Sequence, residues 1–556
     1  MRYLFALGLH ALGQAGPTFP LATEYEAEDQ KTSGTLIGPD RTLGTVAAEA
    51  SGRRAIELHE SSESMQLNLR TSAQGLTIRY ALPESLAARE QTPAVVIHAD
   101  GREIAAVLLG SRYLQPYWKN PSAPAPTKAP PRYWDEVRVL LPQPLRSGTT
   151  LTIRPRAGAI GFAVDVMDAE PVAEPKAKPP NALSIRDFGG DPTGQRSSRT
   201  AFLRAIATAR QSGKPLYVGR GQYKVDGHLI LDRVTISGAG PWYTVISGHH
   251  LGFYSRRAGS SGVSLSGLAL ESDVTKRRDR LPLAAIGGRY SRSEFSNLYL
   301  HHAKVGIWLD GPAHDLAIRN VRIADQAADG INLHRGISRA IVENNQIRNS
   351  GDDGIASWSD QVANSDILIR DNRVIAPRLA NGIALYGGRN IEVSHNLIAD
   401  TLTEGGGLHL GTRFHSAPFS GWIRIANNTV VRSAAIDPHW HFGVGAIWIY
   451  ALERPISAAI TVSENSIVDA GCEAVQFLGP KRIDGVRIRG LKISGSLSSI
   501  FALQTAGSLH AESIEVEAPT SSLTVEVPQN FRLVRGHGNS GWEMASVSRL
   551  APPTCR

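Results

Sequence analysis

Three aspartates recur at one point of an internal repeat. Residues 328–334 read ADGINLH, and residues 352–358, which begin 24 positions later, read DDGIASW. If such repeats stack as coils, equal repeat positions become neighbours about 4.8 Å apart. The repeat therefore predicts that the carboxylates of Asp329, Asp352 and Asp353 converge. Clustered carboxylates suit acid/base hydrolysis, because crowding keeps one carboxyl protonated as an acid while another activates water.

The repeat extends well beyond these two copies. It recurs with steps of 24, 24, 28, 25 and 39 residues, and its strands cover residues 305–310, 329–334, 353–358, 381–386, 406–411 and 445–450. A second series runs out of phase with the first and places an asparagine near a bend in each copy, at Asn320, Asn345, Asn372, Asn396, Asn428 and Asn465. Short alternating strands with Gly and Asn at a fixed period predict a parallel β-helix. Leucine-rich repeats share the period, but these coils show no helical periodicity.

The asparagine series is interpreted as architectural, because Asn tolerates a left-handed bend and can pair along a stack. Within the first series, the fourth and sixth positions of each strand should point outward, since Ile and Leu alternate inward. The outward positions carry aromatic and polar side chains that predict a polysaccharide trough, with substrate contacts from Trp308, Asp310, Asn332, His334, Trp358, Tyr386, His409 and Trp448.

The 39-residue step leaves room for loops that build the walls of this trough. Residues 436–442 form one such loop and add Trp440 as a candidate substrate contact. His439 and His441 flank it, but no third ligand stands at a telling spacing, so substrate contact or loop packing is favoured over a metal.

Composition excludes several classes of partner. The 556 residues include 59 basic and 51 acidic side chains, a modest formal excess of +8 without a like-charge block, so no nucleic-acid partner is expected. No segment other than the N-terminal one approaches the roughly 18 apolar residues of a membrane span, so no membrane partner is expected either. Residues 1–16 have a basic start, a short apolar stretch and small residues, which predict a signal peptide and secretion over an ordinary N-terminal strand.

Cys472 and Cys555 are the two cysteines, which excludes a disulfide framework and leaves one bridge from the C-terminal tail to a late coil open. We expect a monomer without a cofactor for catalysis. Residues 169–181 are rich in Pro, Ala and charge and predict a linker. Upstream, residues 22–168 alternate as a β-sandwich does, and downstream residues 182–556 hold the β-helix, so the chain is all-β.

Residues 185–194 lead into an amphipathic helix at 200–209, which would cover the open edge of the first coil. This segment resembles the N-terminal cap of the pectate-lyase-like superfamily, which implies a right-handed parallel β-helix.

The predicted sandwich opens with YEAE at 25–28 and closes with FAVDV at 162–166. These ends resemble the terminal strands of carbohydrate-binding modules of families 6 and 35. The resemblance implies a structural calcium ion, with Glu26, Glu28 and Asp165 as candidate ligands; ordinary solvated edge carboxylates are the alternative. Four aromatic residues could stack on sugars or simply pack, namely Tyr117, Trp118, Tyr133 and Trp134.

The motifs ADGIN at 328–332, GDDGIASWS at 351–359 and GAGPWYTV at 238–245 resemble glycoside hydrolase family 87, the mycodextranases and α-1,3-glucanases, over most of residues 181–480. The resemblance implies endo-hydrolysis of α-1,3-linked glucans such as mutan and nigeran, with inversion, by Asp329, Asp352 and Asp353. The related polygalacturonase clan implies Asp352 as the acid and the other two as the base pair. Its Gly-His-Gly and Arg-Ile-Lys blocks are missing here, so a galacturonan substrate is not expected.

Three alternatives stay open. The chain could be another β-helix polysaccharide hydrolase of the dextranase or polygalacturonase type, or a non-catalytic β-helix glycan-binding protein that shares the fold without the chemistry. The aspartate cluster could also hold calcium. A purely structural stack is disfavoured, since burying uncompensated charge is costly.

Overall fold

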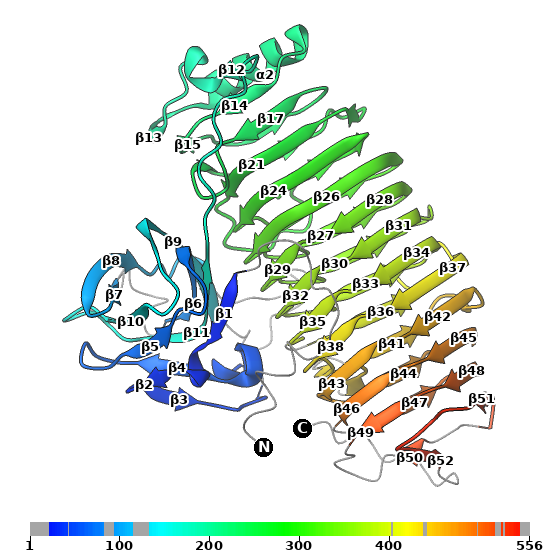
Figure 1. The fold of residues 1–556 in the computed structure, drawn as a ribbon. Helices are drawn as coiled ribbons and strands as arrows, with labels where there is room; N and C mark the ends of the chain where they lie inside the picture. Colours follow the sequence, from blue (N-terminus) through cyan, green and yellow to red (C-terminus); the bar gives the residue numbers. More distant parts are fainter. Residues whose placement is uncertain are drawn as a thin grey trace.

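The structure is a computed structural model that describes residues 22–42, 44–82, 94–114, 133–401, 404–437, 442–496, 499–517, 524–525 and 529–544. An N-terminal unit of antiparallel strands lies beside a long stack of parallel strands (Figure 1). The predicted signal peptide, Trp440 and Cys555 lie outside the described residues. Cys472 is buried and disulfide-bonded. Among the described helices, none has the length and apolarity needed to cross a membrane.

The N-terminal unit contains two antiparallel sheets. One has the order β3-β4-β11-β6-β9 with β1 paired to β11, and the other has the order β2-β5-β10-β7-β8. Apolar side chains of both sheets, such as Ile78 and Ile153, share one buried cluster. The strands are β1 (Thr23–Glu26), β2 (Lys31–Thr32), β3 (Thr35–Ile37), β4 (Ala55–Leu58), β5 (Met65–Asn68), β6 (Ala73–Ala81), β7 (Ala94–Ala99), β8 (Arg102–Leu108), β9 (Trp134–Leu145), β10 (Thr150–Pro155) and β11 (Phe162–Glu170).

Two sequence expectations change in this unit. Strand β11 continues to Glu170, so the extended linker begins two residues later than the composition suggested. Tyr133 and Trp134 are 5% and 0% exposed and belong to a buried cluster, which assigns them to packing rather than to sugar contact. Tyr117 and Trp118 fall outside the described residues.

The stack begins with a helical cap, as predicted. Helix α2 (Arg199–Ser212) buries Phe202 and Ile206 against the first coils and ends at Gly213, which adopts a left-handed φ of 68°. Figure 1 shows the helix at the teal end of the stack, where it covers the open coil edge. The cap also contains β12 (Leu183–Ser184), a 3-10 turn η5 (Ile185–Phe188) and β13 (Thr193–Ser197).

A sheet of eleven parallel strands forms the face of the stack that carries the repeated motif. Its order follows the chain: β16 (His228–Ile230), β19 (Gly252–Tyr254), β22 (Ala284–Gly288), β25 (Val305–Asp310), β27 (Ile331–His334), β30 (Ile355–Trp358), β33 (Ile383–Tyr386), β36 (Leu408–Gly411), β41 (Ile447–Tyr450), β44 (Val475–Leu478) and β47 (Phe501–Gln504).

A second parallel sheet of 24 strands wraps the rest of each coil. After β12 and β13 it contains β14 (Leu216–Val218), β15 (Gly221–Lys224), β17 (Thr235–Gly238), β18 (Thr244–Ser247), β21 (Ser264–Glu271), β24 (Ser293–His301), β26 (Ala313–Ala324), β28 (Ile337–Glu343), β29 (Gln346–Arg348), β31 (Ser365–Arg370), β32 (Arg373–Ile375), β34 (Gly388–Ser394), β35 (Leu397–Ala399), β37 (Phe419–Ala426), β38 (Thr429–Val431), β42 (Ala459–Ser463), β43 (Ser466–Ala470), β45 (Ile483–Arg489), β46 (Lys492–Ser496), β48 (Gly507–Glu512), β49 (Glu515–Glu517) and β51 (Phe531–Arg535).

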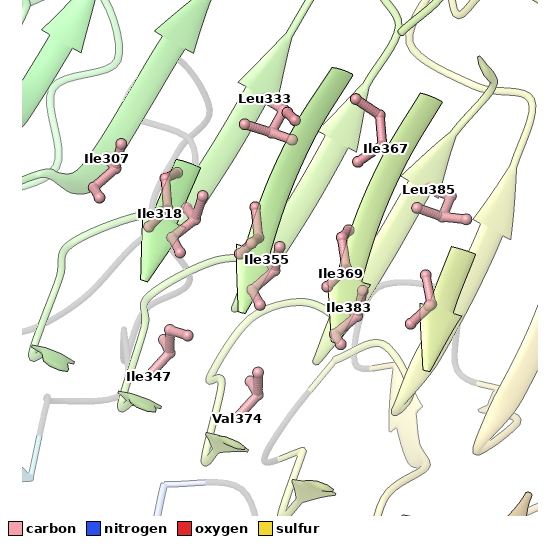
Figure 2. Close-up of a cluster of buried hydrophobic side chains, with 14 of the residues drawn as sticks. Ile307, Ile318, Leu333, Ile347, Ile355, Ile367, Ile369, Val374, Ile383 and Leu385 are labelled. Carbon is pink, nitrogen blue, oxygen red and sulfur yellow. The ribbon is translucent and has the colours of Figure 1, made fainter. Parts of the chain in front are cut away.

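Three short pairs complete the strands: β20 (Ser260–Ser261) with β23 (Tyr290–Ser291), β39 (Ala435–Asp437) with β40 (Phe442–Val444), and β50 (Thr524–Val525) with β52 (Glu543–Met544). The interior of the coils is a continuous column of Ile, Leu and Val. Figure 2 shows these side chains from both sheets meeting inside the stack, for example Leu333 and Leu385 from one sheet with Ile369 from the other. This architecture fits the predicted parallel β-helix.

The asparagine series forms a hydrogen-bonded ladder inside the bends. Asn345 donates its side-chain amide to Asn372 Oδ1 at 2.9 Å, and the same bond repeats through Asn396, Asn428 and Asn465. Asn320 is not part of it, because its place in the register is taken by Val321, whose N–H donates to Asn345 Oδ1. The left-handed residue of each bend is the one before the ladder asparagine, such as Asn344 at φ 55°, rather than the ladder residue itself.

Candidate active site

The stacking of coils brings the three aspartates together. Asp329 and Asp353 each stand two residues before a strand, β27 and β30, and the Gly330 N–H donates to the Asp353 carbonyl at 3.0 Å, as expected for equal positions of adjacent coils. One carboxylate oxygen from each of Asp329, Asp352 and Asp353 lies within 4.8 Å of the other two. The predicted convergence is therefore present in the structure.

Asp353 is held by donors from the next coil. Its Oδ1 accepts from both the backbone and the side-chain amide of Asn381, each at 2.9 Å, and its Oδ2 accepts from the Tyr386 hydroxyl at 2.9 Å. The side chain is 4% exposed, and burial followed by the charge of Asp352 raises its pKa to about 6. The donors favour the carboxylate, and burial with crowding favours the acid.

Asp329 has fewer donors in the same crowded place. Its Oδ2 accepts from the Asn332 side chain at 2.9 Å. Burial, followed by the charges of Asp352 and Asp353, raises its pKa well above the ordinary range of a carboxyl. Burial and crowding thus favour the protonated form of Asp329.

Asp352 faces a cation. Arg277 Nη1 donates to Asp352 Oδ2 at 2.6 Å, and the two side chains are 13% and 16% exposed. Arg277 belongs to the segment after β21, which Lys304 anchors by donating to the carbonyls of Asp279 and Leu281 at 2.9 and 2.6 Å. An ion pair of this kind favours the ionised form of Asp352.

The three carboxylates lie in a cleft of about 1090 Å³. Its lining includes six of the predicted substrate contacts: Trp308, Asp310, Asn332, Trp358, Tyr386 and Trp448. The register aligns them in two columns across successive strands, because Trp308 pairs with Asn332 and Asp310 pairs with His334, which is followed by Trp358 and Tyr386. This is the volume and aromatic lining of a site for an extended, partly polar ligand.

The outward stripe is less exposed than the alternation predicted. His409 is 1% exposed, lies stacked under Trp448 with 3.8 Å between ring centroids, and is not among the lining residues of the cleft. His334 is also absent from the lining; its Nδ1 donates to Asp310 Oδ1 at 2.8 Å, and its ring contacts Trp308. Both histidines therefore pack against side chains that line the cleft.

The walls contribute lining residues that the repeat did not reveal. Arg413 and Phe414 lie in the loop after β36, where Phe414 is 44% exposed and its carbonyl accepts from Trp358 Nε1 at 3.0 Å. Tyr254 and Arg277, which precede the three aspartates in the sequence, also line the cleft. Asn381 occupies the repeat position of Asp329 and Asp353 one coil later, so its place at the cluster could have been read from the period.

Glu26, Glu28 and Asp165 lie near one another in the N-terminal unit. Ser51 Oγ donates to Glu26 at 2.5 Å and to Asp165 at 2.9 Å, and Arg79 pairs with the other oxygen of Asp165. Burial, followed by the charge of Asp165, raises the pKa of Glu28 to about 8 and that of Glu26 well above its usual range. These are not solvated edge carboxylates, although Arg79 already supplies part of the positive charge that they need.

Comparisons with known proteins identify the family. One family model, the α-1,3-glucanase catalytic domain D1, matches residues 19–172, and another, the catalytic domain D2, matches residues 195–415. The crystal structure of the catalytic unit of a thermostable GH87 α-1,3-glucanase from Streptomyces thermodiastaticus strain HF3-3 is 31% identical, covers 97% of this chain and 100% of its own, and has a TM-score of 0.89. This chain belongs to glycoside hydrolase family 87.

This glycoside hydrolase is also similar to the Agl-KA catalytic domain, at 26% identity, with 94% of this chain and 97% of that chain covered and a TM-score of 0.84. A GH87 α-1,3-glucanase catalytic domain in complex with nigerose shares the fold at 23% identity, with 95% and 100% covered and a TM-score of 0.81. Among curated proteins, no sequence matches the enzyme. The N-terminal unit, for which the sequence predicted a carbohydrate-binding module, corresponds to the domain described as catalytic domain D1.

Proposed function

We propose that this enzyme is a secreted, monomeric endo-hydrolase that cleaves α-1,3-glucosidic linkages of α-glucans with inversion. The observation that carries the proposal is the trio of crowded carboxylates in an aromatic-lined cleft of about 1090 Å³. Crowding leaves one carboxyl protonated at neutral pH and the others ionised, which is the pairing that glycoside hydrolysis needs. Aromatic rings such as Trp308 and Trp358 offer flat surfaces for sugar faces.

The solved relatives support the substrate. GH87 α-1,3-glucanase domains have been solved in complex with nigerose and with tetrasaccharides. These include variants in which one of three aspartates is replaced by alanine, and the three replaced positions are separated by 23 residues and one residue. Asp329, Asp352 and Asp353 have the same separations.

In the proposed mechanism, Asp352 protonates the departing glycosidic oxygen, while Asp329 and Asp353 position and activate water. Asp352 is the most exposed of the three carboxylates, with 16% of its side chain accessible from the cleft. Its ion pair with Arg277 opposes protonation in the free enzyme, so this role requires substrate to draw Arg277 away. Sugar hydroxyls entering beside Arg277 would compete for its guanidinium.

The electrostatics of the free enzyme favour a second assignment, in which Asp329 is the acid. Burial and crowding raise the pKa of Asp329, whereas the ion pair with Arg277 opposes protonation of Asp352. The two assignments separate with an aryl α-glucoside whose leaving group needs no protonation. Replacing the true acid by Asn should lower activity on glucan on the order of 10²–10⁴-fold, but should lower activity on the aryl substrate much less. Loss on both substrates marks a water-activating residue, so comparing Asp352→Asn with Asp329→Asn decides the roles.

The stereochemistry needs a direct test, because the carboxylates are closer than usual. Their nearest oxygens lie within 4.8 Å, whereas inverting glycosidases commonly separate the acid and base by roughly 6.5–9.5 Å. Proton NMR of early products from α-1,3-glucan should show the β-anomer first. If the α-anomer appears first, the mechanism is retaining and not inverting, while the family and the cleaved linkage are unaffected.

The linkage is tested by reducing-sugar release from α-1,3-glucan, nigeran, dextran and polygalacturonate. We expect release from the first two substrates only, insensitive to chelator and lost in Asp352→Asn, with internal cuts giving a rapid fall in glucan length. Release from dextran or polygalacturonate would favour another β-helix hydrolase. Glucan pull-down without release from any substrate would favour a non-catalytic glycan-binding protein.

We also propose that the two-sheet N-terminal unit is a β-sandwich of the carbohydrate-binding kind, with a structural calcium ion at Glu26, Glu28 and Asp165. The crowded, protonation-prone oxygens of these residues support it, since a hard cation would neutralise them. Added Ca²⁺ should raise the melting temperature of the wild type and not of Glu28→Gln. An equal response of both proteins would contradict a calcium site at these residues.

Secretion is tested separately, by N-terminal sequencing of the protein recovered from culture medium.

A further inference from the structure

A second cluster of potential ligands lies at the seam between the N-terminal unit and the β-helix. It consists of Asp135 from β9, His301 and His302 at the end of β24, and Asp325 just after β26. These four residues are 2%, 5%, 5% and 0% exposed. The proposed reaction uses none of them. The β-helix supplies three of the four, and packing of the N-terminal unit adds Asp135.

The ligand atoms of the four residues point at one another. His302 Nε2 lies 2.8 Å from Asp135 Oδ1, while His301 Nε2 lies 2.9 Å from Asp325 Oδ2 and 3.7 Å from Asp135 Oδ1. All four ligand atoms are within 4.8 Å of one another. Zinc bound at about 2.0–2.1 Å by tetrahedral nitrogen and oxygen ligands separates neighbouring ligands by roughly 3.3 Å, which is the middle of this range.

Outer partners orient three of the four ligands for this geometry. His301 Nδ1 donates to Glu271 Oε2 at 3.0 Å, so Nε2, which is hydrogen-bonded to Asp325 at 2.9 Å, is the nitrogen that would face a metal after losing its proton. The Tyr80 hydroxyl lies 3.3 Å from Asp135 Oδ2, and Asn349 donates to Asp325 Oδ1. A carboxylate behind a histidine, with hydrogen bonds behind the carboxylate ligands, is the usual surrounding of a bound metal.

The seam is also closed to solvent. The ring of Tyr113 stacks on His302 with 3.3 Å between centroids and 10° between planes, and the two histidine rings stack at 3.5 Å. Asp135 and Asp325 therefore share a dry place with two imidazoles, and a third carboxylate, Glu271, stands at its edge with 31% of its side chain exposed. Even one imidazolium leaves an excess of negative charge, and buried charge of this kind is compensated by a partner or by a metal.

We infer that Asp135, His301, His302 and Asp325 bind a divalent transition metal that links the N-terminal unit to the β-helix. The mixed nitrogen and oxygen ligands indicate Zn²⁺. Two imidazoles distinguish this site from the aspartate cluster of the cleft, whose all-oxygen ligands suit hard cations. The inference is independent of the proposed function, because it concerns the attachment of two units and not the reaction.

The test measures metal on the intact chain. Wild-type protein is stripped with chelator, titrated with Zn²⁺ and dialysed, and bound zinc is measured by mass spectrometry; Co²⁺ is then substituted and its visible d–d bands are recorded. We expect about one equivalent per chain, bands of tetrahedral intensity, and a higher melting temperature with zinc. Glu271→Gln should weaken binding about 10–100-fold, because it changes only the orienting carboxylate.

Matched variants locate the ion. His302→Ala should lose the bound metal and the cobalt bands, whereas His314→Ala, at an exposed histidine, and Asp353→Asn, in the cleft, should keep both. Wild-type protein that retains no zinc, or His302→Ala and wild type with equal zinc and equal cobalt spectra, overturns the inference and leaves a protonated histidine network at the seam. Because the wild-type result alone can overturn it, poor folding of His302→Ala does not protect the inference.

Discussion

Arg277 tunes the protonation of the aspartate cluster from outside the repeat. Its charge lowers the pKa of Asp329, and its hydrogen bond favours ionised Asp352. Replacing it by Met should therefore raise the pKa values of the cluster, so that the carboxylates that activate water ionise at higher pH. We expect the acidic limb of the kcat/KM profile on soluble α-1,3-glucan oligomers to move up by about one unit. Arg277→Lys, which keeps the charge, should move it less, and superimposable profiles of Arg277→Met and wild type would contradict this account.

Asp353 should cost stability at neutral pH. Its folded-state pKa of about 6 exceeds the ordinary 3.8, so the folded protein holds this proton more tightly than the unfolded chain does. The stabilising contribution is complete below about pH 4 and is lost as the pH rises through about 6. Asp353→Asn should therefore be inactive yet more stable than wild type at pH 7, with a free energy of unfolding that is higher by up to about 3 kcal/mol. It should also melt at a higher temperature at this pH, and both differences should vanish near pH 4.

Asp315→Asn is the matched control for this change. Asp315 is exposed, and its hydrogen bonds with Arg339 lower its pKa, so removing its charge should not stabilise the protein at any pH. Calorimetry of the three proteins at several pH values makes the comparison. If Asp353→Asn melts below wild type at pH 7, the hydrogen bonds from Asn381 and Tyr386 outweigh the charge crowding.

For individual residues, the sequence repeat predicted that the aspartates converge, but it could not locate site residues that lie outside the repeat. Asp329, Asp352 and Asp353 follow from equal repeat positions, and Asn381 was available from the same reasoning. Arg277 was not, since it lies in an irregular segment whose path depends on tertiary contacts such as those of Lys304.

The asparagine ladder is the element that fixes the bends of the coils. Asn396 Oδ1 accepts from the backbone and side-chain amides of Asn372, at 2.9 Å each, inside the stack. Asn396→Leu leaves these donors buried without a partner, and each such group costs about 1–3 kcal/mol. We expect a clear loss in the free energy of unfolding by denaturant, whereas Asn68→Leu, at an exposed position of strand β5, should change it by less than about 0.5 kcal/mol. Equal changes in the free energy of unfolding for the two variants would show that the asparagine ladder does not stabilise the bends.

Element-level prediction succeeded where pattern and packing coincide. Alternation placed the strands of the coils and the cap helix α2 correctly, because inward Ile and Leu have a single way to be buried. It failed at Asn320, which occupies the left-handed position of its bend, as Asn344 does one coil later, and not the ladder position. It also overstated the exposure of His409 and Trp448, since strand alternation carries no information about which face later loops will cover.

The whole molecule depends on buried charge pairing between its two units. Arg348 of β29 donates to Glu136 and Asp168 at 2.8 and 2.9 Å and to Glu24 at 3.1 Å, and its side chain is 3% exposed. Arg348→Met leaves three carboxylates without this partner and should destabilise the protein by about 3–5 kcal/mol.

Arg339→Met is the control, because the Arg339–Asp315 pair is exposed and its loss should leave the free energy of unfolding nearly unchanged. Denaturant unfolding followed by tryptophan fluorescence and circular dichroism makes the measurement. Two separated transitions in wild type, with Arg348→Met affecting neither, would show that the units fold independently and that this contact contributes little.

The stacking of the cleft suggests how such enzymes can diversify. Asp329 and Asp353 each belong to a single coil, and the flanking rings come from other coils on either side. A whole coil contacts mainly its two neighbours, so duplication or deletion of one coil at a distance from the aspartates would lengthen or shorten the bound chain by a fixed step while the reacting centre stays intact. The coil is thus a unit of inheritance: recombination at its boundaries can change product size without rebuilding the chemistry.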